Sequence, residues 1–148
     1  MIKNFIDISD FNIKNLNAII NLAKKIKKNP NNFSNKCKNK TLGMIFQKES
    51  IRTRVSFNVG FQKLGGHATE LIADKIGFGN RESYEDIIKT LSQFFNILMI
   101  RNDDHKLIKY LSSLNVMPII NGLSDYSHPC QILSDMLTID EQIGNLKN

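Results

Sequence analysis

The sequence predicts an α/β fold, a three-layer domain in which a four-stranded parallel sheet is flanked by helices. Four short apolar runs alternate with segments of helical length along the chain, as they do in proteins with parallel sheets. These runs lack the polar–apolar alternation of strands that face water, so both faces of the sheet are expected to be covered. The length of 148 residues fits one domain.

The first expected helix covers residues 9–29. Apolar side chains recur there every three or four positions, which gives the helix one apolar face. Ser9 and Asp10 can cap its N-terminus, and Pro30 lies just past its end. The polar stretch that follows, residues 29–40, is expected to be a loop.

Strands and helices alternate in the rest of the chain. Four apolar runs are expected to be strands, at residues 42–46, 67–72, 97–100 and 116–120. The helices that follow them are expected at residues 52–64, 83–95, 103–114 and 129–143, with loops at 73–82 and 121–127. Gly65 and Gly66 end the first of these helices, and Ser83 begins a near capping box. Pro118 weakens the fourth strand, because proline cannot donate to a sheet.

Composition excludes several classes of protein. No apolar run reaches the roughly 18 residues that span a bilayer, and the N-terminus lacks the apolar stretch of a signal peptide. The two cysteines, Cys37 and Cys130, form neither a disulfide framework nor a metal-ligand spacing. Membrane, collagen-like, disulfide-rich and zinc-finger classes are therefore excluded, and a reducing cytoplasm is the expected compartment.

The net charge of +6 comes from one part of the chain. Residues 1–40 contain nine lysines and two acids, whereas the rest contains eleven bases and twelve acids. No aromatic side chains lie between these lysines, as a surface that stacks bases would require. A solvated helix face is therefore favoured over a nucleic-acid-binding arm, which stays as the weaker alternative.

The segment between the first strand and the next helix has the composition of an anion site. In parallel sheets, ligands bind beyond the carboxyl ends of the strands. The helix N-terminus there offers free N–H groups, and Ser50 and Thr53 add hydroxyl donors. Arg52 and Arg54 are two of only four arginines in the chain, and bases at a helix N-terminus oppose the helix dipole. A bound anion explains them better than an exposed basic turn.

Three further residues lie at other strand ends. Arg101 follows the third strand, where it can reach the same anion or simply extend into water. His128 and Gln131 stand three apart at the start of the last helix. A lone histidine at a helix cap is usually structural, but this pair beside an anion site can hold a carbonyl and an amide. Cys130 has no charged partner at this spacing and is expected to be unreactive.

Together these segments resemble the carbamoyl-phosphate-binding half of the aspartate and ornithine carbamoyltransferase family. The family's phosphate signature, Ser-Thr-Arg-Thr-Arg, stands here as residues 50–54, with Ile51 in place of the first threonine. The second signature, His-Pro-x-Gln, stands as residues 128–131. The features most like the ornithine enzymes are residues 42–46, Gly65-Gly66, residues 121–125 and Cys130.

The resemblance implies a reaction and a role for each site residue. The carbamoyl group of carbamoyl phosphate passes to the δ-amine of ornithine, giving citrulline and phosphate, as in arginine biosynthesis or the urea cycle. The phosphate would be held by Ser50, Ile51, Arg52, Thr53, Arg54 and the adjacent amides. Arg101 would bridge the phosphate and the carbamoyl oxygen, His128 would donate to that oxygen, and Gln131 would hold the carbamoyl NH2. No metal or other cofactor is implied.

The resemblance also implies how the enzyme is organised. Residues 1–148 are expected to form the carbamoyl-phosphate-binding domain, and the second domain, which binds ornithine, is expected to be absent from this chain. Family members form trimers in which the loop after the second strand reaches the next subunit's site. Gly77 has no side chain that could reach that site. Lys75 and Arg81 are therefore the candidates to supply a positive charge to the next subunit, and the alternative is that both are solvated loop residues. No nucleic-acid or membrane partner is expected.

Two other functions stay open at this point. The chain can instead be the corresponding half of an aspartate carbamoyltransferase. It can also be an anion-binding or assembly module without catalytic activity.

Overall fold

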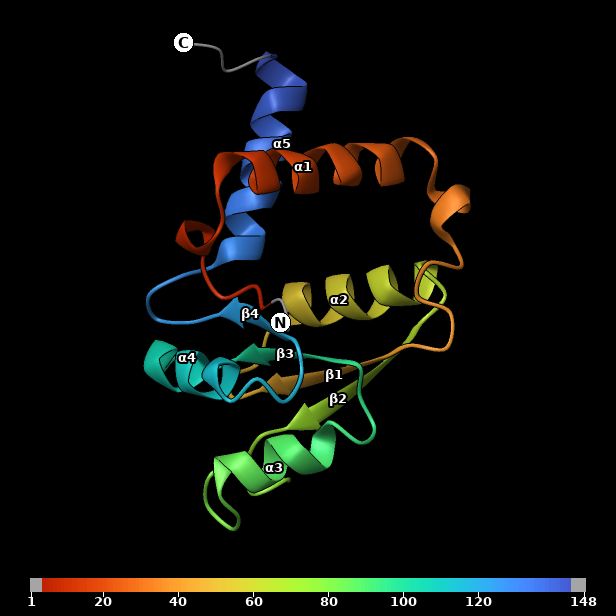
Figure 1. The fold of residues 1–148 in the computed structure, drawn as a ribbon. Helices are drawn as coiled ribbons and strands as arrows, with labels where there is room; N and C mark the ends of the chain where they lie inside the picture. Colours follow the sequence, from red (N-terminus) through yellow and green to blue (C-terminus); the bar gives the residue numbers. More distant parts are fainter. Residues whose placement is uncertain (1–3, 145–148) are drawn as a thin grey trace.

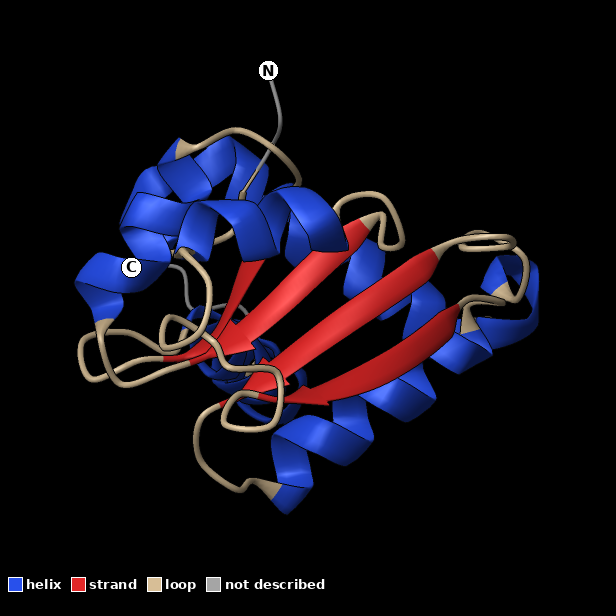
Figure 2. Ribbon diagram, turned by 90° about the horizontal axis from the view of Figure 1, so that it is seen from below, coloured by secondary structure: helices blue, strands red, loops and turns tan. Residues whose placement is uncertain are grey.

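Four parallel strands form the sheet at the centre of the computed structural model, which describes residues 4–144. They are β1 (Thr41–Phe46), β2 (His67–Ile72), β3 (Ile97–Arg101) and β4 (Ile119–Leu123), in the order β2-β1-β3-β4. The α-helices are α1 (Ile13–Lys28), α2 (Ile51–Lys63), α3 (Tyr84–Leu91), α4 (His105–Ser113) and α5 (Pro129–Ile143). Helices lie on both sides of the sheet (Figures 1 and 2), so the predicted three-layer α/β architecture is confirmed.

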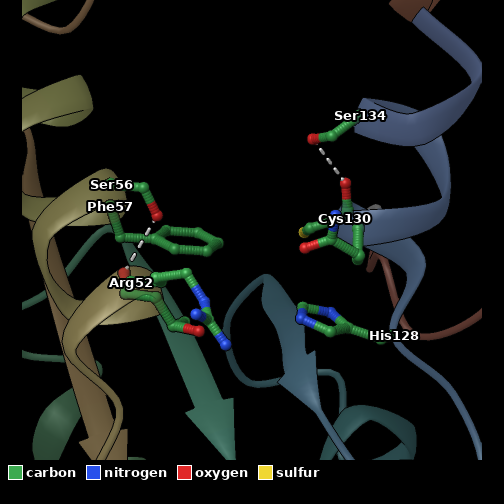
Figure 3. Close-up of a pocket in the computed structure, with 8 residues that line it drawn as sticks. Arg52, Ser56, Phe57, His128, Cys130 and Ser134 are labelled. Carbon is green, nitrogen blue, oxygen red and sulfur yellow. Dashed lines mark hydrogen bonds between the residues drawn. The ribbon is translucent and has the colours of Figure 1, made fainter. Parts of the chain in front are cut away.

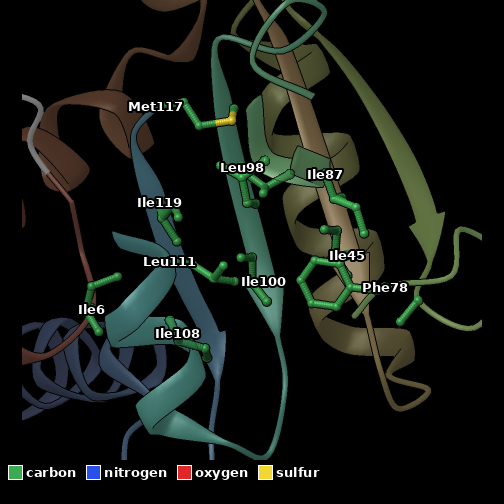
Figure 4. Close-up of a cluster of buried hydrophobic side chains, with 12 residues drawn as sticks. Ile6, Ile45, Phe78, Ile87, Leu98, Ile100, Ile108, Leu111, Met117 and Ile119 are labelled. Carbon is green, nitrogen blue, oxygen red and sulfur yellow. The ribbon is translucent and has the colours of Figure 1, made fainter. Parts of the chain in front are cut away.

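The two faces of the sheet bury separate cores because successive side chains of a strand point to opposite faces. On one face, Leu42, Met44, Phe46 and Met99 pack against α2. On the other face, a larger apolar cluster packs against α3 and α4 (Figure 4). Its buried members on the strands include Ile45, Leu98, Ile100 and Ile119. The two inner strands, β1 and β3, are mostly buried, which explains why they read as unbroken apolar runs, whereas the edge strand β2 is partly exposed and carries Thr69 and Glu70.

The strand order reverses at β1, the first strand of the chain. The strand after β1 lies on one side of it, and β3 lies on the other. Because crossover connections are right-handed, α2 covers one face of the sheet whereas α3 and α4 cover the opposite face. The ends of β1 and β3 therefore bound the crevice in which sheets of this kind bind ligands.

The first helix differs from the prediction of a single segment over residues 9–29. A short 3-10 helix, Ile8–Asp10, comes first, and its capping box joins Asp7 and Asp10. Phe11 is then extended, and its ring packs edge-on against Phe5 at 5.2 Å. Asn12, rather than Ser9 or Asp10, caps α1. The prediction of the cap was wrong because the Asp10 carboxylate accepts from the Asp7 N–H, which precedes it in the chain.

The long α1 helix lies outside the sheet layers and packs against α5. None of its side chains is fully buried. Ile20 and Ala23 face Leu133 and Leu137 of α5. Ion pairs also join the two helices, between Lys24 and Asp140 and between Lys27 and Glu141. Within the described part of the chain, residues 4–144, no helix is both long and apolar enough to cross a membrane.

The fourth strand lies three residues later than the predicted 116–120, and part of the predicted loop 121–127 belongs to it. The Pro118 carbonyl accepts from the Leu98 N–H at 3.0 Å, but Pro118 has no N–H to donate in return. The strand therefore begins after it. The strand continues through Asn121 because the backbone N–H of that residue donates to Phe5 at 2.8 Å. The N-terminal segment thus covers the outer edge of β4.

We predict that Gly65→Ala destabilises the chain by at least about 2 kcal/mol. Gly65 has a φ of +89°, and a Cβ there would overlap the carbonyl oxygen of Ser34. Gly60 is the control, because it lies within α2 with open space around its Cβ position. Gly60→Ala should stabilise the helix by about 0.5–1 kcal/mol. Urea unfolding measures both, and equal effects would contradict the prediction.

Candidate functional site

A cleft of about 220 Å³ opens between the first turns of α2 and α5. Figure 3 shows the side chains of Arg52 and His128 pointing into this space from opposite sides. The residues that line it are Arg52, Thr53, Ser56, Phe57, His128, Cys130, Gln131 and Ser134. The two sequence signatures, which stand more than seventy residues apart in the chain, therefore meet at one cleft.

The Arg101 guanidinium joins the end of β3 to the start of α2. It donates to the Ser50 hydroxyl at 3.0 Å and to the Thr53 hydroxyl at 3.1 Å. Because both hydroxyl oxygens accept from Arg101, their own protons are available to donate to a bound anion. Arg101 is thus fixed at the site instead of extending into water, which was the other expectation for it.

The N-terminus of α2 supplies further donors. Ser50 caps the helix, its hydroxyl accepting from the Thr53 N–H at 3.4 Å. The N–H groups of Ile51 and Arg52 belong to the first turn, where a helix offers no carbonyl partner. These N–H groups carry the positive end of the helix dipole. Ile51 can contribute only its backbone, since its side chain points to solvent with 76% of its area exposed.

The two signature arginines have different surroundings. Arg54 pairs with Glu70 at 2.8 Å and lies over the Phe46 ring at 5.3 Å. It does not line the cleft, and its place among the phosphate ligands stays a prediction. Glu70 offsets its charge at the helix N-terminus. Arg52 lines the cleft, and among the described residues it forms no salt bridge.

His128 precedes α5 without capping it. Its side chain makes no cap hydrogen bond, and its buried Nδ1 has no hydrogen-bond partner among the described residues. Burial lowers the pKa of His128 below its usual value, and the charge of Arg101 lowers it further, against a smaller opposite effect of Asp135. The imidazole is therefore neutral at pH 7 and can donate one hydrogen bond to a ligand.

Gln131 and Cys130 complete the α5 side of the cleft. The Gln131 amide nitrogen donates to Asp135 at 2.8 Å, which leaves the side-chain carbonyl oxygen to accept from a ligand. Burial raises the pKa of the Cys130 thiol to about 11. The thiol is therefore protonated near pH 7, which agrees with the predicted lack of reactivity.

Some lining residues were not expected from the sequence, and the two residues expected to serve a neighbouring subunit lie outside this cleft. Ser56, Phe57 and Ser134 line the cleft from one turn beyond the signatures, so helical spacing from Arg52 and Gln131 could have found them. Lys75 and Arg81 are exposed in the loop after β2 and do not line the cleft of their own chain. Between residues 4 and 144, no group of three or more His, Cys, Asp or Glu side chains is placed to hold a metal ion.

Comparison with known proteins assigns the chain and its fold to one family. Residues 3–141 match the family described as "Aspartate/ornithine carbamoyltransferase, carbamoyl-P binding domain". The chain belongs to this family of carbamoyltransferases. Among its curated relatives, the ornithine carbamoyltransferase of Anoxybacillus flavithermus is 39% identical over 98% of this chain, and the chloroplastic enzyme of Pisum sativum is 41% identical over 99%.

Solved structures of the family agree with the fold. The ornithine carbamoyltransferase of Pyrococcus furiosus is 38% identical and superposes with a TM-score of 0.94 over 99% of this chain. The enzyme of Thermus thermophilus is 34% identical, with a TM-score of 0.91. The chain spans about half the length of these relatives, 47% of the Anoxybacillus and Pyrococcus proteins and 51% of the Thermus protein.

We predict that Arg101→Met raises the pKa of His128 toward its usual value without fully restoring it. The substitution removes the positive charge, but burial, the larger cause of the lowered pKa, persists. NMR titration of the histidine ring measures the change. Lys48→Met is the control, because Lys48 is exposed and paired with Asp103. An unchanged or lower His128 pKa in Arg101→Met would contradict the conclusion that the charge of Arg101 acts on the His128 ring.

Proposed function

We propose that this chain is the carbamoyl-phosphate-binding half of an ornithine carbamoyltransferase. One observation carries the proposal. The Arg101 guanidinium is bonded to two hydroxyls at the N-terminus of α2, and across a small cleft from this helix stands a neutral histidine. These groups suit a ligand that has a phosphate at one end and a carbonyl at the other.

The phosphate end would lie at the first turn of α2. The free N–H groups of that turn, the hydroxyls of Ser50 and Thr53, and the Arg52 side chain are all donors. Charge-assisted hydrogen bonds from these groups stabilise an anion. Their effect grows as the phosphate leaves and gains charge, so they favour the transition state over the bound substrate.

The carbamoyl end would lie toward His128, Arg101 and Gln131. Attack by an amine builds negative charge on the carbonyl oxygen, and donors held in place beforehand stabilise that charge. The neutral His128 ring and the Arg101 guanidinium supply these donors. The free carbonyl oxygen of Gln131 accepts from the carbamoyl NH2. The amine nitrogen would bond to the carbonyl carbon as the C–O bond to phosphate breaks, and the leaving phosphate would take that electron pair and a proton from the amine.

The amine would be that of ornithine, bound by a second domain. Relatives named ornithine carbamoyltransferase match nearly the whole chain, which supports ornithine over aspartate. The reaction would serve arginine biosynthesis or a urea-cycle step, in the cytoplasm. An aspartate enzyme and an anion-binding module without activity are the competing functions, and the experiment below separates them.

The first test measures ligand binding by the 148-residue chain. It should bind carbamoyl phosphate and inorganic phosphate and form no citrulline alone, because positioning of the amine provides a large part of such a rate. Arg52→Lys should weaken carbamoyl phosphate binding by about tenfold, since an ammonium cannot copy a bidentate guanidinium. Lys48→Arg, the control, should have no effect, because Lys48 is paired with Asp103.

A chimera then tests catalysis. This chain is joined to the second half of the Anoxybacillus flavithermus relative, and citrulline formation is assayed with ornithine. The proposal is supported if the chimera is active and Arg52→Lys lowers its kcat/KM by an amount that corresponds to a loss of about 2–4 kcal/mol of transition-state stabilisation. A folded chimera that is inactive, while the unaltered relative is active, would instead identify a module without activity. Carbamoylation of aspartate after joining the chain to an aspartate enzyme's second half would identify the aspartate function.

The proposal includes a homotrimer in which the loop after β2 reaches a neighbour's cleft. Lys75 and Arg81 are exposed on this loop, whose turns at Gly77 and Gly79 have positive φ angles. Both side chains are therefore available to a partner copy and play no part in the cleft of their own chain.

We predict that mixing two inactive chimeras, Arg52→Ala and Arg81→Ala, restores part of the activity. A mixed trimer contains a site in which neither change occurs, if each site takes Arg81 from the next subunit. Citrulline formation after subunit exchange measures the rescue, and two portions of the same variant serve as the control. No rescue, with exchange confirmed by mass spectrometry, would place Arg81 outside the site.

A further inference from the structure

A buried polar cluster lies behind the catalytic loop, where the loop from β4 to α5 passes the start of α4 (Figure 1). Its members share an unusual property for polar side chains, since each is at least nine-tenths buried. They are Asp7, His105, Asn121, Ser124 and Ser127. None of these residues lines the cleft, and the chemistry proposed above does not use them. Buried polar groups of this kind require a role, because their desolvation is costly.

The cluster converges on the peptide that joins Ser127 to His128. The Ser127 carbonyl accepts from the Ser124 N–H at 3.0 Å and from the Asn121 side chain at 3.1 Å. The Ser127 N–H donates to the Ser124 hydroxyl oxygen at 3.1 Å. The Ser124 hydroxyl also donates to the Ser127 carbonyl at 3.2 Å, so four hydrogen bonds fix this residue's backbone directly before His128.

His105 completes the cluster through the Ser124 hydroxyl. Its Nδ1 lies 2.8 Å from that oxygen, closer than the Ser127 carbonyl at 3.2 Å. The Ser124 hydroxyl thus joins the His105 ring to the backbone of Ser127, whose N–H donates to the same oxygen.

Two more contacts anchor the cluster to distant parts of the chain. Asn121 also donates to the Ile6 carbonyl at 3.0 Å, which ties it to the N-terminal segment. The backbone N–H of His105 donates to the Asp125 side chain at 3.2 Å. The backbone N–H of Asp125 donates to the Asp103 carbonyl at 3.0 Å. The loop that leads to His128 is therefore held from both sides.

We infer that His105, Asn121 and Ser124 are positioning residues that hold the His128 ring toward the anion cleft. At the start of α5, the N–H groups of Gln131 and Ile132 donate to the His128 carbonyl at 3.1 Å, but these bonds do not reach the ring. His128 makes no cap hydrogen bond, and Pro129, which follows it, has no N–H. The direction of the ring then depends on the peptide before it, which the cluster fixes. This inference rests on the proposed function, in which His128 donates to the carbamoyl oxygen.

The test compares Ser124→Ala with Ser113→Ala in the 148-residue chain. Both lose a hydroxyl, but Ser113 is exposed and donates only to the Tyr110 carbonyl. His128 is followed by NMR titration, which is simple because the chain has three histidines. Ser124→Ala should raise the His128 pKa, because the ring leaves its buried position, and weaken carbamoyl phosphate binding about fivefold, because His128 no longer donates to the carbamoyl oxygen. Ser113→Ala should change neither.

A second pair of variants decides the matter if Ser124→Ala does not fold. His105→Asn keeps a polar atom near the position of Nδ1, whereas His105→Leu removes it. His105→Asn should keep the wild-type His128 titration and carbamoyl phosphate affinity. His105→Leu should raise the His128 pKa and weaken carbamoyl phosphate binding, as expected for Ser124→Ala. A lower melting temperature in Ser124→Ala and His105→Leu, with both readouts at wild-type values, would overturn the inference and leave the cluster a purely structural role.

The same measurements separate this inference from the proposed function. If the wild-type chain binds neither phosphate nor carbamoyl phosphate, but the His128 pKa still moves in Ser124→Ala, positioning is supported and the proposed function fails. If the wild-type chain binds both ligands and Ser124→Ala binds them equally well with an unchanged His128 pKa, the proposed function is supported and the inference is wrong.

Discussion

Phe46 and Arg101 lie opposite each other where β1 and β3 end, and the geometry of the site follows from this register. The Gln47 N–H extends the pairing by donating to the Arg101 carbonyl at 3.0 Å. The chain leaving β1 is thereby held beside β3, and α2 begins four residues later within reach of the Arg101 side chain. A shift of one residue would turn Arg101 to the opposite face of the sheet, away from α2.

A β-bulge next to this pairing has a second consequence. The register between β3 and β4 shifts at Arg101, so that Gly122 is the extra residue of β4. A Cβ at Gly122 would overlap the sulfur of Met99. A larger residue at this position would therefore force the Met99 side chain to move. The bulge sets where β4 ends and where the loop to His128 begins.

The charges of the site are arranged for a ligand that is negative. Arg52 and Arg101 stand near the positive end of the α2 dipole, which is unfavourable without an anion. The lowered pKa of His128 keeps that ring from adding another positive charge. Among the residues that the structure describes, Arg54 is the one of these three arginines that forms an ion pair, with Glu70. An anion at the α2 N-terminus would relieve the remaining repulsion, and the same groups would stabilise the phosphate as it leaves.

The sequence by itself determined the fold class, the existence and order of the strands and helices, and the segments that meet at the cleft. These features depend on local patterns, namely apolar runs, helical periodicity, caps such as Ser50 and breaks such as Gly65. Tertiary structure alone decided which arginine faces the cleft, where β4 begins, and how the loop before His128 is held. Those features depend on partners far away in the chain, such as Glu70 for Arg54 and Ile6, 115 residues from Asn121. A local pattern carries no information about such partners, because only folding brings them within hydrogen-bonding distance.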